Sequence, residues 1–187
     1  MIRSFKYVSL TSHGSPQPVF GTTLGAATGP ATSNVGGTQS ASVNSQVTVQ
    51  VADSSFFLAG DLVNFDVGAS EEKTSVVSVT DGTHIVVAGL TKSHAISTYV
   101  RLAMNATNVY IQTPDGNTGP IWIGTKSTMA TSTGVFCLKK LLYVAANAIP
   151  TDLLVEAAGF PGPLSLAEFF FDGTTNGDKI LPSCVID

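Results

Sequence analysis

The chain has 187 residues, a formal net charge of −4 and only 12% charged residues, about half the share that is usual in soluble domains. Its nine basic residues are scattered, and only Lys139 and Lys140 are adjacent, which excludes the clustered basic stripe of a nucleic-acid-binding surface. Ser, Thr, Gly and Ala take the place of charges. This composition is typical of a protein whose faces are covered by neighbouring subunits, although a neutral monomer would share it.

The sequence also bears on export and membranes. The N-terminus is positively charged, but no apolar run of signal-peptide length follows it. The longest apolar stretch, residues 141–149, is interrupted by Asn147 and is far shorter than the roughly 20 residues that span a bilayer. We therefore expect a protein made in a cytoplasm, without a signal peptide and without a membrane partner.

Residues 1–45 are predicted to form an extended arm. One short strand fits the region of Phe5 and Tyr7, after which Gly, Ser, Thr, Ala and Pro dominate. Such a segment alone buries too little apolar surface to offset the entropy of ordering it. We expect a neighbouring subunit to hold the arm, with Phe5, Tyr7, Val19 and Phe20 as its anchors.

Residues 46–103 carry the clearest strand signal and are predicted to be a β-strand module. Apolar and polar residues alternate in residues 47–51 and 63–67, which is the period of a half-buried strand. Two further runs flank Asp81-Gly82, a dipeptide typical of a tight hairpin turn. With residues 99–102 this gives about five strands and no helix, folded as a small barrel or sandwich.

Residues 104–187 are predicted to be a second β domain. Residues 109–112 and 121–123 read as strands, residues 153–158 are favoured as a strand, and residues 135–144 fit either two strands or a helical turn. Three consecutive Phe end at Phe171. Because they cannot all face one core, Phe170 is predicted to face a second layer or a subunit neighbour. The predicted fold class is thus all-β, an N-terminal arm followed by two small β barrel or sandwich units.

The cysteines and the glycosylation-like motif indicate no special chemistry. Cys137 and Cys184 are too few and too far apart for a disulfide framework or a Cys-x-x-Cys metal site. Both have apolar neighbours and are predicted to be buried free thiols. Asn105-Ala106-Thr107 spells a glycosylation acceptor, but without a signal peptide it meets no glycosylating enzyme.

No catalytic signature is found. His13, His84 and His94 lie in Ser/Thr-rich or turn-like surroundings, and no Gly-x-Ser-x-Gly or phosphate-binding glycine motif occurs. The members of a hydrolase triad meet in space, so spacing alone leaves one open. We expect a protein that is not an enzyme and holds no cofactor.

The turn from Asp172 to Asp178 has some features of a calcium loop. It matches the first, fifth and sixth positions of an EF-hand loop, but Thr174 and Ser183 occupy the third and twelfth positions. The flanking residues are strand-like. An ordinary turn is therefore favoured over a metal site, and cation binding stays open.

The main acidic concentration in the sequence lies in the strand module. It comprises Asp61, Asp66, Glu71 and Glu72. Two carboxylates are also the machinery of a glycosidase, but no aromatic-lined groove accompanies them. A solvated strand edge, where charges deter unwanted pairing, is the favoured interpretation.

One resemblance to a known class of proteins rests on residues 47–66 and 71–87. Their order of strand, Phe57-Leu-Ala-Gly-Asp61 turn, second strand and hairpin, closed by a strand such as 99–102, resembles a β-module in structural proteins of tailed bacteriophages. The second half, from Asn108 onward, is similar in style to virion decoration and neck proteins. The resemblance implies a structural role and brings no catalytic residues.

These observations predict a virion structural protein, assembled in the host cytoplasm and located in the particle. The leading interpretation is a capsid decoration or cement protein that forms homo-oligomers and binds the major capsid protein or other virion proteins. The alternatives are a neck or tail component, or a receptor- or glycan-binding module.

Overall fold

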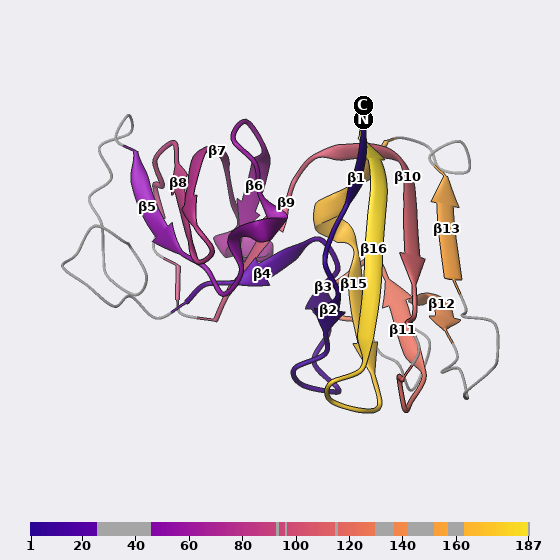
Figure 1. Ribbon diagram of the computed structural model, residues 1–187. Helices are drawn as coiled ribbons and strands as arrows, with labels where there is room; N and C mark the ends of the chain where they lie inside the picture. The colour runs from indigo at the N-terminus through magenta and orange to yellow at the C-terminus, as the bar shows by residue number, and fades with distance from the viewer. Residues whose placement is uncertain are drawn as a thin grey trace. The chain divides into compact units, whose positions relative to one another are not determined.

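The computed structural model describes residues 1–25, 46–92, 94–95, 97–114, 116–129, 137–141, 152–156 and 163–186 (Figure 1). Within these residues the chain is built from β-strands, and its helical elements are short 3₁₀ turns at Ser54–Phe56, Gly68–Ser70 and Leu166–Glu168. The prediction of an all-β fold is confirmed.

The chain divides into two compact units. The split unit combines Met1–Val19 with Asn105–Asp187, and the inserted unit is the continuous segment Phe20–Met104. The C-terminal boundary of the inserted unit lies within one residue of the predicted boundary at 103/104. The N-terminal boundary differs, because the residues predicted to form an arm are shared between the two units.

The first 25 residues form strands whose partners lie far along the chain. β1 (Ile2–Ser4) and β2 (Val8–Ser9) pair with β16 (Lys179–Ile186), β3 (Gln17–Pro18) pairs with β15 (Phe170–Gly173), and β4 (Gly21–Thr23) pairs with β9 (Tyr99–Leu102). These ladders satisfy backbone groups inside the chain. The predicted arm is therefore wrong for residues 1–25, and residues 26–45 lie outside the described residues.

The inserted unit is a single curled sheet in the order β4-β9-β6-β7-β8-β5. Its remaining strands are β5 (Val47–Gln50), β6 (Leu62–Phe65), β7 (Glu72–Asp81) and β8 (His84–Val87). The two ends of this order meet through a bridge between Leu24 and Val51. Gly25 N donates to Gln50 O at 3.1 Å and Ala52 N to Thr23 O at 2.8 Å. The six strands therefore close into a small barrel, and β4 is one of its strands.

The core of the inserted unit follows the predicted alternation. Val47, Val49, Val63 and Phe65 are buried, and the polar residues between them are more exposed. β7 and β8 meet at the predicted Asp81-Gly82 turn, where Thr83 N donates to Asp81 Oδ1 at 2.7 Å. Because a strand that faces a closed barrel hides every second side chain, this pattern could be predicted from the sequence.

The split unit contains two sheets. The first has the order β1-β16-β10-β13, with β14 also paired to β10 and β2 to β16, and the second has the order β12-β11-β15-β3. The strands not yet bounded are β10 (Asn105–Gln112), β11 (Ile121–Gly124), β12 (Cys137–Leu141), β13 (Asp152–Glu156) and β14 (Leu164–Ser165). β13 confirms the strand favoured for residues 153–158 as far as Glu156, and residues 157 and 158 lie outside the described residues. Residues 137–141 form a strand, so the helical alternative does not hold there.

The split unit buries one face of its long strands. Along β16 the residues alternate between partly exposed and buried positions, and Ile180 and Cys184 are among the buried ones. Cys184 is a buried free thiol, as predicted. Every residue of β15 is buried, so this strand is covered on both faces by its own chain.

The place of Gly21 in β4 yields a first prediction. A Cβ at this position would clash with the Val100 carbonyl oxygen and lie 2.9 Å from Arg101 Cα, both of which are backbone atoms of β9. Gly21→Ala should therefore lower the free energy of unfolding by about 1–3 kcal/mol in urea titrations followed by circular dichroism. Gly82→Ala is the control, because Gly82 lacks a positive φ and has open space around it. Equal effects of the two substitutions would contradict the close approach of β4 to β9.

Candidate functional site

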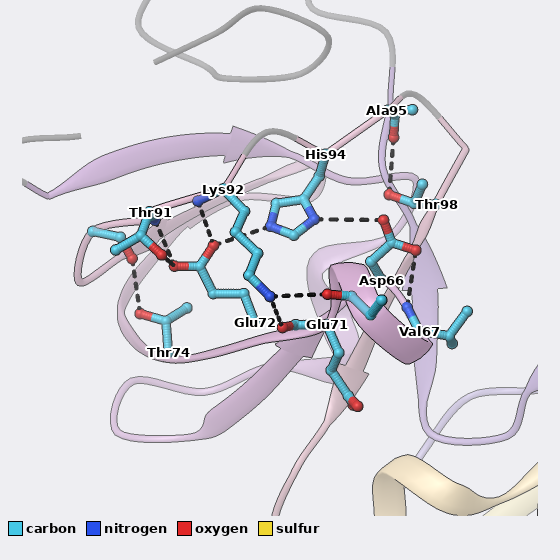
Figure 2. Close-up of polar contacts among 12 residues, drawn as sticks. Asp66, Val67, Glu71, Glu72, Thr74, Thr91, Lys92, His94, Ala95 and Thr98 are labelled. Carbon is cyan, nitrogen blue, oxygen red and sulfur yellow. Dashed lines mark hydrogen bonds and ion pairs between the residues drawn. The ribbon is translucent and has the colours of Figure 1, made fainter. Parts of the chain in front are cut away.

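A cluster of charged side chains ties together two loops of the inserted unit. We call it the polar clasp and define it by three acidic and three basic residues: Asp66, Glu71, Glu72, Lys92, His94 and Arg101. The acidic residues lie where the chain passes from β6 to β7, and the basic residues lie between β8 and the middle of β9. Figure 2 shows His94 between the carboxylates of Glu72 and Asp66, and the Lys92 side chain reaching the backbone carbonyl of Glu71.

Asp66 ends strand β6. Its φ of +63° is unusual for a residue with a side chain, and it turns the chain out of the sheet. Asp66 N donates to Tyr99 O at 2.8 Å, and Asp66 Oδ1 accepts from Val67 N at 2.9 Å. An Asp tolerates this conformation because its short carboxylate bonds to the neighbouring backbone.

Glu72 is the acceptor at the centre of the clasp. Its carboxylate accepts hydrogen bonds from Thr91 N, Thr91 Oγ1 and Lys92 N at 2.5 to 2.8 Å, and its Oε2 lies 3.2 Å from His94 Nε2. Burial acts to raise the pKa of Glu72, but the hydrogen bonds from Thr91, Lys92 and His94 outweigh it and hold this pKa below its ordinary value. The ionised carboxylate is thus the form that binds the loop.

His94 is buried between two carboxylates. The residue is 1% exposed, its ring centroid lies 5.3 Å from that of Phe65, and its Nδ1 lies 3.7 Å from Asp66 Oδ2. The two ring nitrogens face different carboxylates, so this histidine does not combine with both acids around one metal ion (Figure 2). Its burial also keeps it away from a substrate, so the arrangement suits the fastening of loops.

Arg101 and Lys92 complete the clasp. Arg101 NH2 lies 2.8 Å from Glu71 Oε1 and is buried to 5% exposure. Lys92 Nζ donates to the Glu71 carbonyl at 2.8 Å and to the Ala69 carbonyl at 3.1 Å. The acidic and the basic side of the clasp are therefore joined at several separate points.

The favoured interpretation of the acidic cluster as a solvated strand edge is wrong for most of its members. Asp61 is 4% exposed and belongs to another turn, where its Oδ2 accepts from Leu58 N at 2.7 Å. The side chains of Asp66 and Glu72 are 21% and 10% exposed and serve the clasp. Their partners are some 20 to 35 residues away, so no local pattern indicates them.

The other two histidines named in the sequence analysis, His13 and His84, lie at turns. His84 Nδ1 is 2.9 Å from both carboxylate oxygens of Asp81 at the β7–β8 hairpin. The hydrogen bond from the Thr83 backbone N–H, together with that from the His84 side chain, lowers the pKa of Asp81 to about 2. His13 N donates to Asn176 Oδ1 at 2.7 Å. Neither histidine contacts a Ser or Cys nucleophile among the contacts of the described residues.

The turn from Asp172 to Asp178 uses its carboxylates to hold backbone. Asp178 Oδ1 accepts from Thr118 N at 2.8 Å and Asp178 Oδ2 accepts from Gly119 N at 2.9 Å. Asp172 Oδ1 accepts from Gly14 N at 2.9 Å and from Gly173 N at 2.7 Å. These bonds tie three loops of the split unit together, and they engage both oxygens of Asp178 and one oxygen of Asp172.

Neither a metal cluster nor a membrane-spanning helix occurs in the described residues. Across those ranges, no three His, Cys, Asp or Glu side chains gather in a metal-binding arrangement. No helix in that part of the chain is long and apolar enough to cross a membrane.

Most of the predicted interface anchors lie in the chain's own core. Phe5 is 8% exposed, Val19 and Phe20 are 0% exposed, and Phe170 is 2% exposed. A neighbouring subunit cannot reach these side chains, so the anchor roles predicted for Phe5, Val19 and Phe20 are wrong. The burial of Phe170 contradicts a contact with a subunit neighbour and is compatible with the alternative of a second layer. Tyr7, which is 55% exposed, is the one predicted anchor that lies at the surface.

A different surface, the outer face of the first sheet of the split unit, is open to a partner. The cross-strand registers place eleven non-buried residues on it, and we call this set the outer sheet face: Ile2, Ser4, Asn108, Tyr110, Gln112, Asp152, Leu154, Glu156, Leu181, Ser183 and Val185. Ile2 is 78% exposed and Leu154 is 54% exposed. Residues at the intervening positions, such as Val109 and Cys184, are buried.

The two charges of the outer sheet face are both on β13 and both engaged. Tyr110 OH donates to Asp152 Oδ2 at 2.6 Å, and Asn108 Nδ2 donates to Glu156 Oε1 at 3.4 Å. The bond to Asp152 raises the pKa of the Tyr110 hydroxyl. The face therefore offers exposed apolar side chains beside polar groups, a mixture that is found in protein interfaces.

The loops held by Asp178 yield a second prediction. Asp178→Asn should lower the free energy of unfolding by about 1–3 kcal/mol. The carboxylate accepts hydrogen bonds from two backbone N–H groups, whereas the NH₂ group of an asparagine would face one of these donors and leave it without an acceptor. Glu168→Gln, at an exposed position of the same unit, should have little effect.

Thermal unfolding of the wild-type chain should not respond to Ca²⁺. A rise of the melting temperature with added Ca²⁺ would contradict this role of the carboxylates.

The comparisons with known proteins supply no family for the chain. No family model matches it, and no curated protein or solved structure shows significant similarity to it. The chain's own residues are therefore the basis for proposing a function.

Proposed function

We propose that this chain is a structural protein of a tailed-bacteriophage particle, a decoration or cement protein that joins neighbouring subunits of the shell. The observation that carries the proposal is the outer sheet face, on which apolar side chains such as Ile2 and Leu154 are exposed. The low share of charged residues and the resemblance of residues 47–87 to a phage β-module support the same conclusion.

The proposed mechanism is passive bridging. The outer sheet face packs against a neighbouring subunit, either another copy of this chain around a local symmetry axis or the major capsid protein. Hydrogen-bonded strands hold the contact residues in place, so little conformational entropy is lost when the partner binds. The exposed apolar residues Ile2 and Leu154 lie on the edge strands β1 and β13, and the polar residues of β10 lie between them, so the contact combines apolar and polar groups as protein interfaces do.

The proposed bridging does not use an N-terminal arm. Residues 1–25 contribute strands to the sheets of both units, so removing them would disrupt both units instead of releasing a contact segment. Tyr7 lies exposed between β1 and β2 and is proposed as an additional contact.

The copy number of the chain in purified particles tests the proposal. Quantitative mass spectrometry should find it at about one copy per major capsid protein, as a shell-covering protein requires. A ratio of a few per cent would place the chain in the neck, tail or fibre instead. Complete absence from particles would overturn the virion proposal and favour a receptor- or glycan-binding module.

A pair of matched variants tests the outer sheet face itself. Leu154→Lys places a charge within the proposed contact, and at least a tenfold loss of affinity for the particle is expected, which corresponds to about 1.4 kcal/mol. Leu58→Lys is the control, because Leu58 is 53% exposed, compared with 54% for Leu154, and belongs to the other unit. Equal occupancy of both variants would exclude the outer sheet face as the contact.

A further inference from the structure

We propose that the polar clasp is an acid-sensitive latch. When its carboxylates take up protons, Thr91, Lys92 and His94 detach from β7 while the strands of the inserted unit stay paired. The opened state uncovers the ring of Phe65 and gives this unit an apolar surface that the closed state hides. This inference concerns the inserted unit and does not depend on the proposed function.

The first argument is the number of bonds that depend on one carboxylate. Thr91 and Lys92 donate their backbone N–H groups to Glu72, and Thr91 also donates its hydroxyl. A protonated carboxyl group is a poorer acceptor and has a proton of its own to donate. Uptake of one proton by Glu72 therefore weakens every one of these bonds together.

The second argument is the balance of charge around Glu72. Two acidic groups of the described residues lie near Glu72: Asp66, which follows β6, and Glu71, which precedes Glu72 in the sequence. The basic groups nearby are Lys92 and His94 from the loop and Arg101 from β9. Lys73 follows Glu72 in β7 and is exposed on the opposite face. Acidification removes negative charge from this set but leaves the positive charges of Lys92 and Arg101, and Arg101 is buried.

The sign of the effect follows from the state of Glu72. Its pKa lies below the ordinary value of 4.5, so the stability that it contributes is present above pH 4.5 and is lost as the pH falls through its lowered pKa. The loop should therefore be closed at neutral pH and open in acid.

The opening is local because the barrel is held by bonds that do not titrate. Leu102 N donates to Phe20 O at 2.8 Å and Val76 N donates to Asp61 O at 2.8 Å, and both acceptors are backbone carbonyls. The side chain of His94, by contrast, meets the barrel through carboxylates and through its ring contact with Phe65. Units that depend on few, titratable contacts open first.

Amide hydrogen exchange by NMR tests the latch on the full wild-type chain. Protection factors of the Thr91 and Lys92 amides should fall at least about tenfold between pH 7 and pH 3, after correction for intrinsic rates. The amides of Val76 and Leu102 should keep their protection, and the nuclear Overhauser contacts between His94 and Phe65 should disappear. Simultaneous loss of protection at all four amides would show global unfolding and overturn the proposal.

Two variants repeat the test at neutral pH. Glu72→Gln imitates the protonated carboxyl, so the Thr91 and Lys92 amides should lose protection at pH 7. Asp81→Asn is the control, because Asp81 lies at the hairpin, outside the clasp, and its pKa of about 2 keeps it ionised at pH 3. Unchanged protection of Thr91 and Lys92 in Glu72→Gln, or in the wild-type chain at pH 3, would overturn the latch.

Discussion

The structure depends on the pairing of the first 25 residues with strands that lie far away in the sequence. β1 and β2 add to β16, β3 adds to β15, and β4 adds to β9. Each of these short strands is too small to be stable alone and gains its hydrogen bonds from a longer partner. Because the chain crosses from one unit to the other after Val19, a single N-terminal segment completes the sheets of both units.

Carboxylates bound to backbone N–H groups are the second recurring device of this chain. Glu72 fastens the Thr91–Lys92 loop of the inserted unit, and Asp178 fastens the Thr118–Gly119 loop of the split unit. A chain with few charged residues thus uses several of them internally, where charge-assisted bonds are strongest. Fewer charges are left for the surface, which agrees with the proposal of a protein covered by neighbours.

Sequence reasoning reached the fold where a signal was local. The alternation at residues 47–51 and the Asp81-Gly82 turn specified strands and a hairpin, because side-chain period and turn chemistry are properties of a few adjacent residues. The arm was misread because β2 and β3 have two residues each and carry no period, so only their distant partners define them. Likewise, the pairing of His94 with Glu72 could not be predicted from its Ser/Thr-rich surroundings, since Glu72 is 22 positions away. The outer sheet face needed the strand registers before its members could be recognised as neighbours.

The central claim is that the barrel needs strand β4 in order to fold, and a comparison of two fragments tests it most directly. Residues 20–104 include β4, whereas residues 46–104 correspond to the module visible in the sequence and lack it. The first fragment should give a well-dispersed ¹H–¹⁵N NMR spectrum and cooperative unfolding, and the second should give a poorly dispersed spectrum. A folded second fragment with the same stability as the first would contradict the account, because β4 would then be dispensable.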